Sequence, residues 1–430
     1  MYQVDNAAAV VAAHRAAQAP ASRWVNRTVL ALGLTSLFTD VSAEMITAVM
    51  PLYLVFGLHV SPLVFGAVDG LYQAAAAPAR LFGGLVADRT RRHKLVAAAG
   101  YGLSTLARIG MVLAGAAWGA LAGLVLVDRL GKGIRTAPRD AMIADATPRR
   151  QWGAAYGVHR ALDMAGATAG PVLAFAVLAV APGGYDAVFV VSLGAGLIGL
   201  AVLVVYAPGV LRRRRTDRPK PTPSVSVGSA LRLVRRAGVA AILVAATLLG
   251  LTTLGDAFVY LVLQDRLDFA VGLFPLLFVA TSVVFMVLAV PVGRLADRVG
   301  RGRVFIGGYA ALLAVYVVLL VPAGAGSVIV AIVLLGAYYA ATDGVLVALV
   351  GETLPDELRG SGMALTATAT SLARLASSLL FGLVWTTAGV RPALVTVTVG
   401  LTVALAVAVV LVGRNRRGRR EEVVDVDVAG

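Results

Sequence analysis

The sequence is poor in residues that carry much of protein chemistry: it has no cysteine, four histidines and only 14% charged residues. Without cysteine, the chain can form no disulfide framework, thiol nucleophile or thiolate metal site. The histidines lie on separate segments with no metal-ligand spacing, at His14, His59, His93 and His159. We therefore expect no enzymatic activity, no metal site and no cofactor.

Apolar residues take the place of the missing charges, since 59% of the chain is hydrophobic. Soluble domains are about 45–50% apolar and about 25% charged, so this composition predicts an integral membrane protein. The apolar runs, such as 241–251 and 393–412, are continuous rather than alternating, which argues against a membrane β-barrel. At about 20 residues per span, the chain has room for ten to twelve helices.

We predict an all-α polytopic membrane protein with twelve transmembrane helices in two six-helix bundles. The predicted spans are 28–57, 62–87, 95–116, 118–141, 152–181, 186–207, 239–264, 270–293, 303–323, 327–350, 360–387 and 391–413.

The net charge of +15 lies mostly in short segments next to these spans. Lysine and arginine residues gather in alternate loops, whereas the intervening turns GLHVSP, AAW, APGGYD and PAGAGS contain neither. The positive-inside rule then places both termini in the cytoplasm. We expect a multi-pass monomer in a bacterial cytoplasmic membrane, with the basic loops facing anionic headgroups. Nucleic acid is not expected as a partner.

One basic, proline-containing segment, 208–237, divides the chain. The predicted organisation is a cytoplasmic arm, a first bundle, this linker, a second bundle and a cytoplasmic tail, at 1–26, 27–207, 208–237, 238–413 and 414–430. The halves resemble repeats, because Gly84–Arg89 (GLVADR) is echoed by Gly293–Arg298 (GRLADR). Two parallel halves around a central site form a transporter architecture.

The predicted helix 118–141 carries charges that lipid cannot accept. Asp128, Lys132, Arg135 and Arg139 recur at i, i+4, i+7 and i+11, which is one helical face. A charged face inside a membrane must point to a protein interior or to a water-filled cavity.

Carboxylates in other spans of the first half are candidates to meet this face. Asp40 and Glu44 lie one turn apart near mid-span, which suits reversible proton binding, although static pairing with Arg129 or Arg108 is the alternative. Asp163 can pair with the basic face. His159 is either a titrating group or a structural hydrogen-bonding residue. The predicted proton-coupling and ion-pair residues are Asp40, Glu44, Asp128, Arg129, His159 and Asp163.

Polar residues in other spans predict the substrate cavity. The first half contributes charged and amide groups, and the second half contributes tyrosines with isolated charges. The candidates are Asp69, Gln73, Arg108, Lys132, Arg135, Asp256, Tyr260, Tyr339, Asp343 and Arg374.

The loop Gly293–Arg303, GRLADRVGRGR, resembles the signature of the major facilitator superfamily, and so does Gly84–Lys94, which has Arg91 where the pattern has glycine. The resemblance covers 27–413. It implies that Asp88 and Arg89 close the cytoplasmic side near Gly360; the alternative is that these loops only set topology. The gating-motif residues are Gly84, Asp88, Arg89, Gly293, Asp297 and Arg298.

Two further motifs point to proton coupling by resemblance. Arg129–Gly133 is similar to the R-x-x-x-G element of proton-coupled members. The motif of Gly166, Gly170 and Pro171 is similar to that of drug–proton antiporters, although Leu173 and Ala174 replace the usual glycine pair; helix packing is the alternative. The stretches 36–45, 128–140 and 143–148 together resemble bacterial efflux permeases.

The expected function is therefore proton-coupled export of a small organic solute by alternating access, with the proton gradient as energy source. The acidic residues favour a cationic drug or an amino acid, whereas the arginines favour an organic anion. Uptake by a symporter or facilitator, organic-anion exchange and a non-transporting receptor remain alternatives.

Overall fold

The computed structural model describes residues 26–148, 151–207, 237–321, 324–352 and 359–428. Within these ranges the regular structure is helical and contains no strand. The first half consists of α2 (Arg27–Leu52), which continues as a π-helical turn (Tyr53–Gly57), α3 (Pro62–Ala74), α4 (Ala76–Thr90), α5 (His93–Ala114), α6 (Trp118–Ala146), α7 (Trp152–Val180) and α8 (Tyr185–Tyr206).

The second half is built in the same way. It consists of α10 (Ala237–Gly250), α11 (Asp256–Leu267), a 3₁₀ turn (Val271–Leu273), α12 (Phe274–Val299), α13 (Arg301–Leu320), α14 (Ala325–Glu352), α15 (Arg359–Ala388) and α16 (Val390–Val428). In the described parts of the chain, nine helical segments are long and apolar enough to cross a membrane. The prediction of an all-helical membrane protein is confirmed, while twelve crossings and cytoplasmic termini stay predictions.

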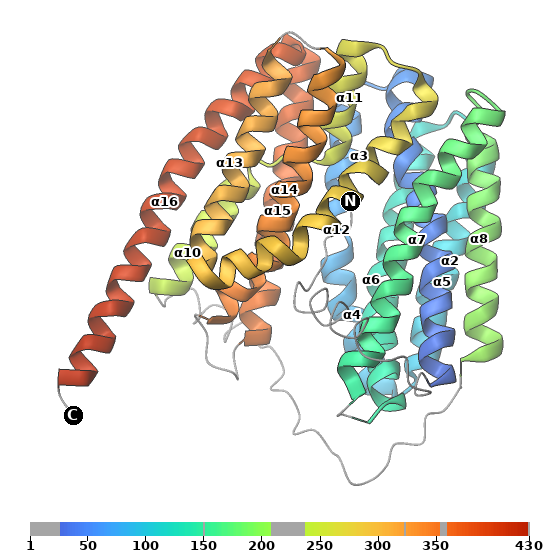
Figure 1. Ribbon diagram of the computed structural model, residues 1–430. Coiled ribbons are helices and arrows are strands. Elements are labelled where there is room, and N and C mark those ends of the chain that lie inside the picture. The colour runs from blue at the N-terminus through green and yellow to red at the C-terminus, as the bar shows by residue number, and fades with distance from the viewer. Residues whose placement is uncertain (1–25, 149–150, 208–236, 322–323, 353–358, 429–430) are drawn as a thin grey trace.

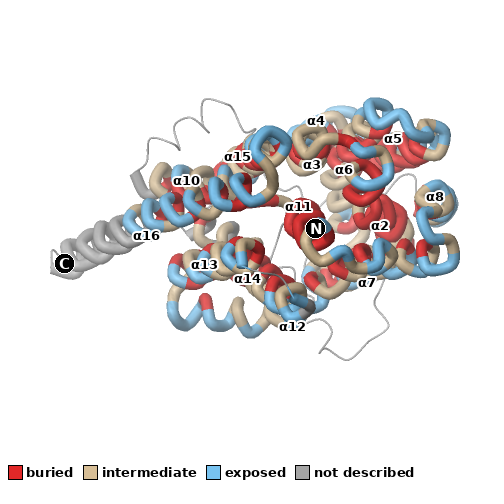
Figure 2. The backbone as a smooth tube through the Cα atoms, turned by 90° about the horizontal axis from the view of Figure 1, so that it is seen from above, coloured by how far each residue is buried: buried red, intermediate tan, exposed pale blue. Residues whose placement is uncertain are grey.

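The helices form two bundles that lie side by side (Figure 1). In the first, α2 packs against α7 and α8, and α5 packs against α6. In the second, α14 packs against α12 and α13. Seen from above, α2 and α11 are buried near the centre, whereas α8 and α16 carry exposed faces at the periphery (Figure 2). The exposed side chains there are largely apolar, for example Val204, Val205 and Val410, as expected for surfaces that face lipid.

Two predicted spans, 62–87 and 239–264, are not continuous helices. The first breaks at Ala75 between α3 and α4. Pro78 explains this break, because it has no N–H to bond the carbonyl of Ala74. The second breaks between α10 and α11, where the Tyr316 hydroxyl accepts a hydrogen bond from Leu254 N (2.8 Å) and donates one to Thr252 O (3.0 Å). Tyr316 thus satisfies backbone groups that the break releases.

The two halves touch where the start of α3 meets the end of α15. A Cβ on Gly66 would clash with the carbonyl oxygen of Ser378, and one on Gly382 would clash with that of Pro62. The Leu63 N–H donates to Thr386 Oγ1 across the same contact (2.9 Å). These ends lie opposite the ends where α8 finishes and α10 begins, and toward the latter the halves diverge (Figure 1).

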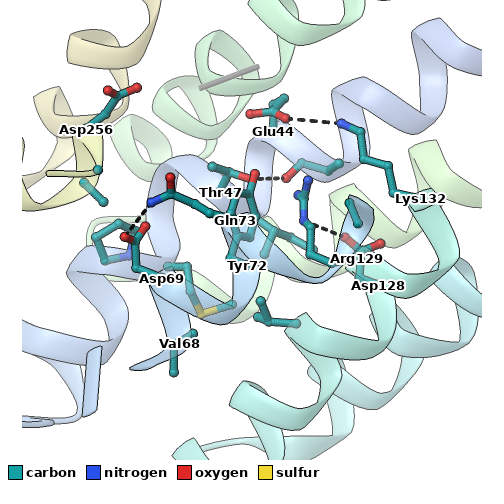
Figure 3. A pocket seen from close by; sticks show the side chains of 18 of the residues that line it. Glu44, Thr47, Val68, Asp69, Tyr72, Gln73, Asp128, Arg129, Lys132 and Asp256 are labelled. Carbon is teal, nitrogen blue, oxygen red and sulfur yellow. Dashed lines mark hydrogen bonds and ion pairs between the residues drawn. The ribbon is translucent and has the colours of Figure 1, made fainter. Parts of the chain in front are cut away.

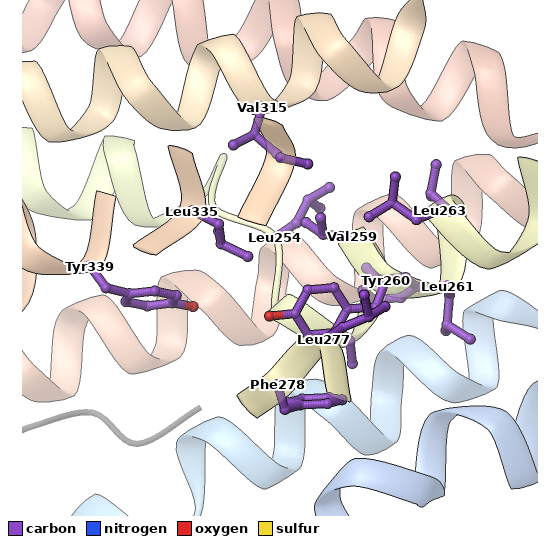
Figure 4. Packing of buried hydrophobic residues seen from close by; sticks show 14 of the residues in the cluster. Leu254, Val259, Tyr260, Leu261, Leu263, Leu277, Phe278, Val315, Leu335 and Tyr339 are labelled. Carbon is purple, nitrogen blue, oxygen red and sulfur yellow. The ribbon is translucent and has the colours of Figure 1, made fainter. Parts of the chain in front are cut away.

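Helix α11 forms the centre of the apolar core in the second half (Figure 4). Its residues from Phe258 to Leu263 are buried on every side, and they pack against Leu277 and Phe278 of α12 and Leu335 of α14. A helix that is apolar all round belongs in a core. The core fixes α11 and therefore the position of its first residue, Asp256.

The two GLVADR-type loops both end their helices at a residue with positive φ. Arg91 ends α4 in the left-handed conformation with φ 55°, and Gly300 ends α12 with φ 98°. The glycine of the signature pattern therefore has a conformational reason, and Arg91 adopts a conformation that costs a residue with a Cβ about 1 kcal/mol.

Replacing Arg91 by glycine should raise the free energy of unfolding by about 1 kcal/mol, because glycine adopts positive φ without the Cβ clash. Thermal unfolding of the purified protein measures this. The matched control is Arg89→Gly within the last turn of α4, which should lower stability by about 1 kcal/mol. Equal effects of both substitutions would contradict the explanation.

Candidate functional site

A cavity of about 160 Å³ lies between the two halves. The first half contributes α2 to α6 to its wall, and the second half contributes the α10–α11 break, α11, α12, α14 and α15. Apolar parts of the wall include Met50, Phe65, Val68 and Phe278. The charged residues of the wall are Glu44, Asp69, Arg80, Asp128, Arg129, Lys132, Asp256 and Arg374.

Helix α6 places Arg129 and Lys132 in the first-half wall (Figure 3). The guanidinium carbon of Arg129 lies 3.6 Å from the centroid of the Tyr72 ring, a cation–π contact. The Tyr72 hydroxyl is 2.9 Å from Thr47 Oγ1 of α2. Lys132 Nζ lies 4.0 Å from Glu44 Oε1, also on α2.

Lys132 is shared by two carboxylates. Its ammonium lies 3.6 Å from Asp40 Oδ1 as well as 4.0 Å from Glu44. Arg135 also reaches Asp40 Oδ1 (3.7 Å) and covers the Tyr101 ring. Asp40 is 2% exposed, so this carboxylate depends on its cationic partners.

A second buried ion pair joins α6 to α5. Arg108 of α5 is 1% exposed, and its Nη1 lies 3.2 Å from Asp128 Oδ1. Asp128 also pairs with Arg129 (3.7 Å). Two predicted cavity residues, Arg108 and Arg135, therefore lie behind the wall and hold wall residues in place.

A polar cluster continues from Asp40 along α2 and α6. Asp163 of α7 pairs with Arg160 (2.9 Å) and Arg139 (3.8 Å). The Ser36 hydroxyl accepts a hydrogen bond from Arg139 (3.1 Å) and lies 3.1 Å from His159 Nε2. Because His159 is buried between such neighbours, its contacts match those of a structural hydrogen-bonding residue.

The second-half wall carries a carboxylate, Asp256, and a guanidinium, Arg374. Tyr339 donates a hydrogen bond to Asp256, and Arg374 Nη2 lies 3.3 Å from the Tyr338 hydroxyl. Tyr260 lies in the apolar core instead, where its hydroxyl donates to Thr281 Oγ1 (2.6 Å). Asp343 is not among the described residues that line the cavity.

Asp69 joins the two halves beside the cavity. Its carboxylate accepts hydrogen bonds from Gln73 on its own helix (2.9 Å) and from Ser378 of α15 (2.8 Å). Ser378 and Tyr72 were not predicted as site residues. Tyr72 could have been found, because it lies three residues after Asp69 on one helix face.

The gating-motif residues lie at the diverging ends of the halves. The Asp88 side chain is 80% exposed and pairs with His93 (3.5 Å), while Asp297 pairs with Arg301 (3.2 Å). Arg89 and Arg298 are also exposed. Gly84 allows α4 to approach Ala137 of α6, but Gly293 has open space around it. The predicted contact of Asp88 and Arg89 near Gly360 lies outside the described residues.

Gly166 and Gly170 hold α7 against α2. A Cβ at either position would clash with backbone of α2, at Leu37 and Val41. The packing alternative for this motif therefore has a structural basis. The contact also fixes the helix that carries Asp40 and Glu44, so packing and a role in the site are compatible.

Comparison with known proteins identifies the family. The family model of the Major Facilitator Superfamily matches residues 32–378 and 258–425. The chain belongs to the Major Facilitator Superfamily. An uncharacterised superfamily transporter of Methanocaldococcus jannaschii is 26% identical over 375 residues, covering 84% of this chain and 89% of the relative.

Solved superfamily transporters share the fold of this protein. A bacterial homologue of the human lysosomal transporter Spinster, in an inward-facing and unoccupied conformation, matches with a TM-score of 0.70 and 14% identity, over 92% of this chain and 98% of the other. A POT family transporter in complex with 5-aminolevulinic acid matches with a TM-score of 0.76 and 12% identity, over 91% and 96%.

Breaking the buried pair behind α6 should destabilise this transporter. Asp128→Asn leaves Arg108 buried without its carboxylate, and we expect a loss of about 3–5 kcal/mol in thermal unfolding. The double variant Asp128→Asn with Arg108→Met should recover most of this loss. If the double variant were as unstable as the single one, loss of the Arg108–Asp128 pair would not explain the lower stability.

Proposed function

We propose that this superfamily transporter couples proton movement to export of a small organic solute by alternating access. It acts as a monomer in the cytoplasmic membrane of a bacterium. The observation that carries the proposal is Lys132, whose ammonium is shared between Asp40 and Glu44 at the cavity wall.

A proton added to Asp40 changes the balance at Lys132. The neutral carboxyl no longer attracts Lys132 or Arg135, and the ammonium is left to Glu44 and to the cavity. Unit charges 4 Å apart interact by about 4 kcal/mol at an effective dielectric constant of 20. A change of this size is sufficient to shift a two-state equilibrium by roughly a thousandfold.

The arrangement of the halves supports alternating access. They touch through α3 and α15 at one end and diverge at the end where α8 finishes. We infer from the basic loops that the diverging end faces the cytoplasm, which makes this conformation inward-open. The opposite conformation requires the bond between Asp69 and Ser378 to break, and exposed Asp88 to find a partner in the second half.

Export rather than uptake is favoured by the antiporter-like motif on α7. This motif packs on the segment of α2 that contains Asp40 and Glu44, so movement of α7 and the proposed proton site are mechanically linked. Organic-anion transport is a second candidate for the solute class, because arginine and lysine side chains from both halves line the cavity.

Asp40→Asn should uncouple transport from the proton gradient. In proteoliposomes with an imposed pH gradient, we expect gradient-driven accumulation to fall at least tenfold while solute exchange persists, because the amide cannot release a proton. The solute is one that stabilises the purified protein in a thermal-shift screen of amino acids, cations and sugar phosphates.

Asp186→Asn is the matched control, since this carboxylate is exposed at the start of α8, away from the cavity. It should leave coupling unchanged. Fully coupled transport by Asp40→Asn would show that Asp40 is not the proton site, and Glu44→Gln would then test the second carboxylate.

A further inference from the structure

The carboxylates of the cavity wall already have partners within the protein. Asp69 accepts from Gln73 and Ser378, and Asp256 accepts from Tyr339. Asp128 pairs with Arg108 and Arg129, and Glu44 lies within 4.0 Å of Lys132. A purely cationic solute would therefore have to displace an internal donor from each acid that it approached.

Arg374 is in the opposite situation. It projects from α15 into the cavity wall, and its polar contact is the neutral Tyr338 hydroxyl at 3.3 Å. In the described part of the chain, its guanidinium forms no ion pair within 4.0 Å, and the carboxylate of Asp343 on α14 acts on it only from a longer distance. Its Nε atom is buried and has no hydrogen-bond acceptor among these residues.

A buried guanidinium that has no anionic partner is costly, because charge removed from water must be compensated by a counter-ion or by hydrogen bonds. The guanidinium also presents its donors as a planar fork, which matches the oxygens of a carboxylate or phosphate. The cavity in front of Arg374 is the place from which such a counter-ion can come.

We propose that the transported solute carries an acidic group, a carboxylate or a phosphate, and that Arg374 binds this group. The inference rests on the proposed transport function and names its substrate class. Apolar wall residues such as Met50, Val68 and Phe278 accommodate an apolar body of the same solute. The compound is thus a small amphiphilic acid that is held at its charged end by the second half.

This assignment also gives the solute a role in the transport cycle. Arg374 belongs to the second half, whereas Arg129, Lys132 and Tyr72 belong to the first. An acid that binds Arg374 and fills the cavity contacts both halves. Its binding energy is then available to bring the halves together on the cytoplasmic side.

The test measures binding without any gradient, so that it is independent of proton coupling. The purified protein in lipid nanodiscs is titrated with acids and their uncharged or cationic partners, and its melting temperature is recorded. The probes are 4-phenylbutyrate with 4-phenylbutyramide, phenylalanine with phenylalaninamide, and phenyl phosphate with phenol.

We expect at least one acid to stabilise the protein while its partner does not. If the carboxylic acids raise the melting temperature more than phenyl phosphate does, Arg374 recognises a carboxylate; the reverse order indicates a phosphate. The affinity of the stabilising acid should fall roughly 10- to 100-fold in Arg374→Ala, since a hydrogen-bonded charge pair is lost. Arg374→Lys should retain part of the affinity. Arg391→Ala, at an exposed arginine at the start of α16, should bind like the parent protein.

The inference is overturned if no acid stabilises the protein, if the amides and phenol bind as well as the acids, or if Arg374→Ala and Arg374→Gln keep full affinity. These outcomes differ from failure of the proposed function. Gradient-driven transport of a cation would overturn the substrate class alone, whereas acid binding without any coupled transport would overturn proton coupling alone.

Discussion

The charged face of α6 is the constraint on which the rest of the structure depends. A membrane-spanning helix that carries Asp128, Arg129, Lys132, Arg135 and Arg139 is stable only if those groups avoid acyl chains. The fold meets this demand with carboxylates from neighbouring helices of the same half. Asp40 and Glu44 of α2 and Asp163 of α7 each lie within 4.0 Å of a cation on α6.

Close helix packing makes those pairs possible. Gly100 and Gly131 let α5 and α6 touch, and Gly166 and Gly170 let α7 touch α2. Small residues of this kind are the usual means by which membrane helices approach each other. The charge network therefore rests on backbone contacts rather than on long side chains alone. The same contacts connect the proposed proton site to the helices that must move during transport.

Helical periodicity predicted which faces are charged but not how deeply each residue lies. Asp69, Lys132, Asp256, Tyr339 and Arg374 were predicted for the cavity, and all of them line it. Arg108 and Tyr260 were predicted for the cavity as well, yet they are buried behind it. From sequence they cannot be separated from wall residues, because their depth depends on which helix packs in front of them.

The breaks in the helices and the contact between the halves could not be predicted from the sequence either. Pro78 marks the α3–α4 break locally, but the α10–α11 break relies on Tyr316, which lies about 60 residues away. The bond from Ser378 to Asp69 joins residues 309 positions apart. Such long-range partners are set by the packing of the two halves, and no local pattern encodes them.

We propose that the charged face of α6 borders a water-filled cavity that opens to the cytoplasm, while the outer faces of the bundles contact lipid. Because the chain has no cysteine, single introduced cysteines can be labelled without background. The most direct measurement compares Ala76→Cys, in the cavity wall, with Leu106→Cys, on the exposed apolar face of α5, using a membrane-impermeant maleimide. We expect that Ala76→Cys is labelled from the cytoplasmic side in inside-out vesicles and that Leu106→Cys is not labelled from either side. Labelling of Ala76→Cys from the external side alone, or labelling of Leu106→Cys but not of Ala76→Cys, would contradict it.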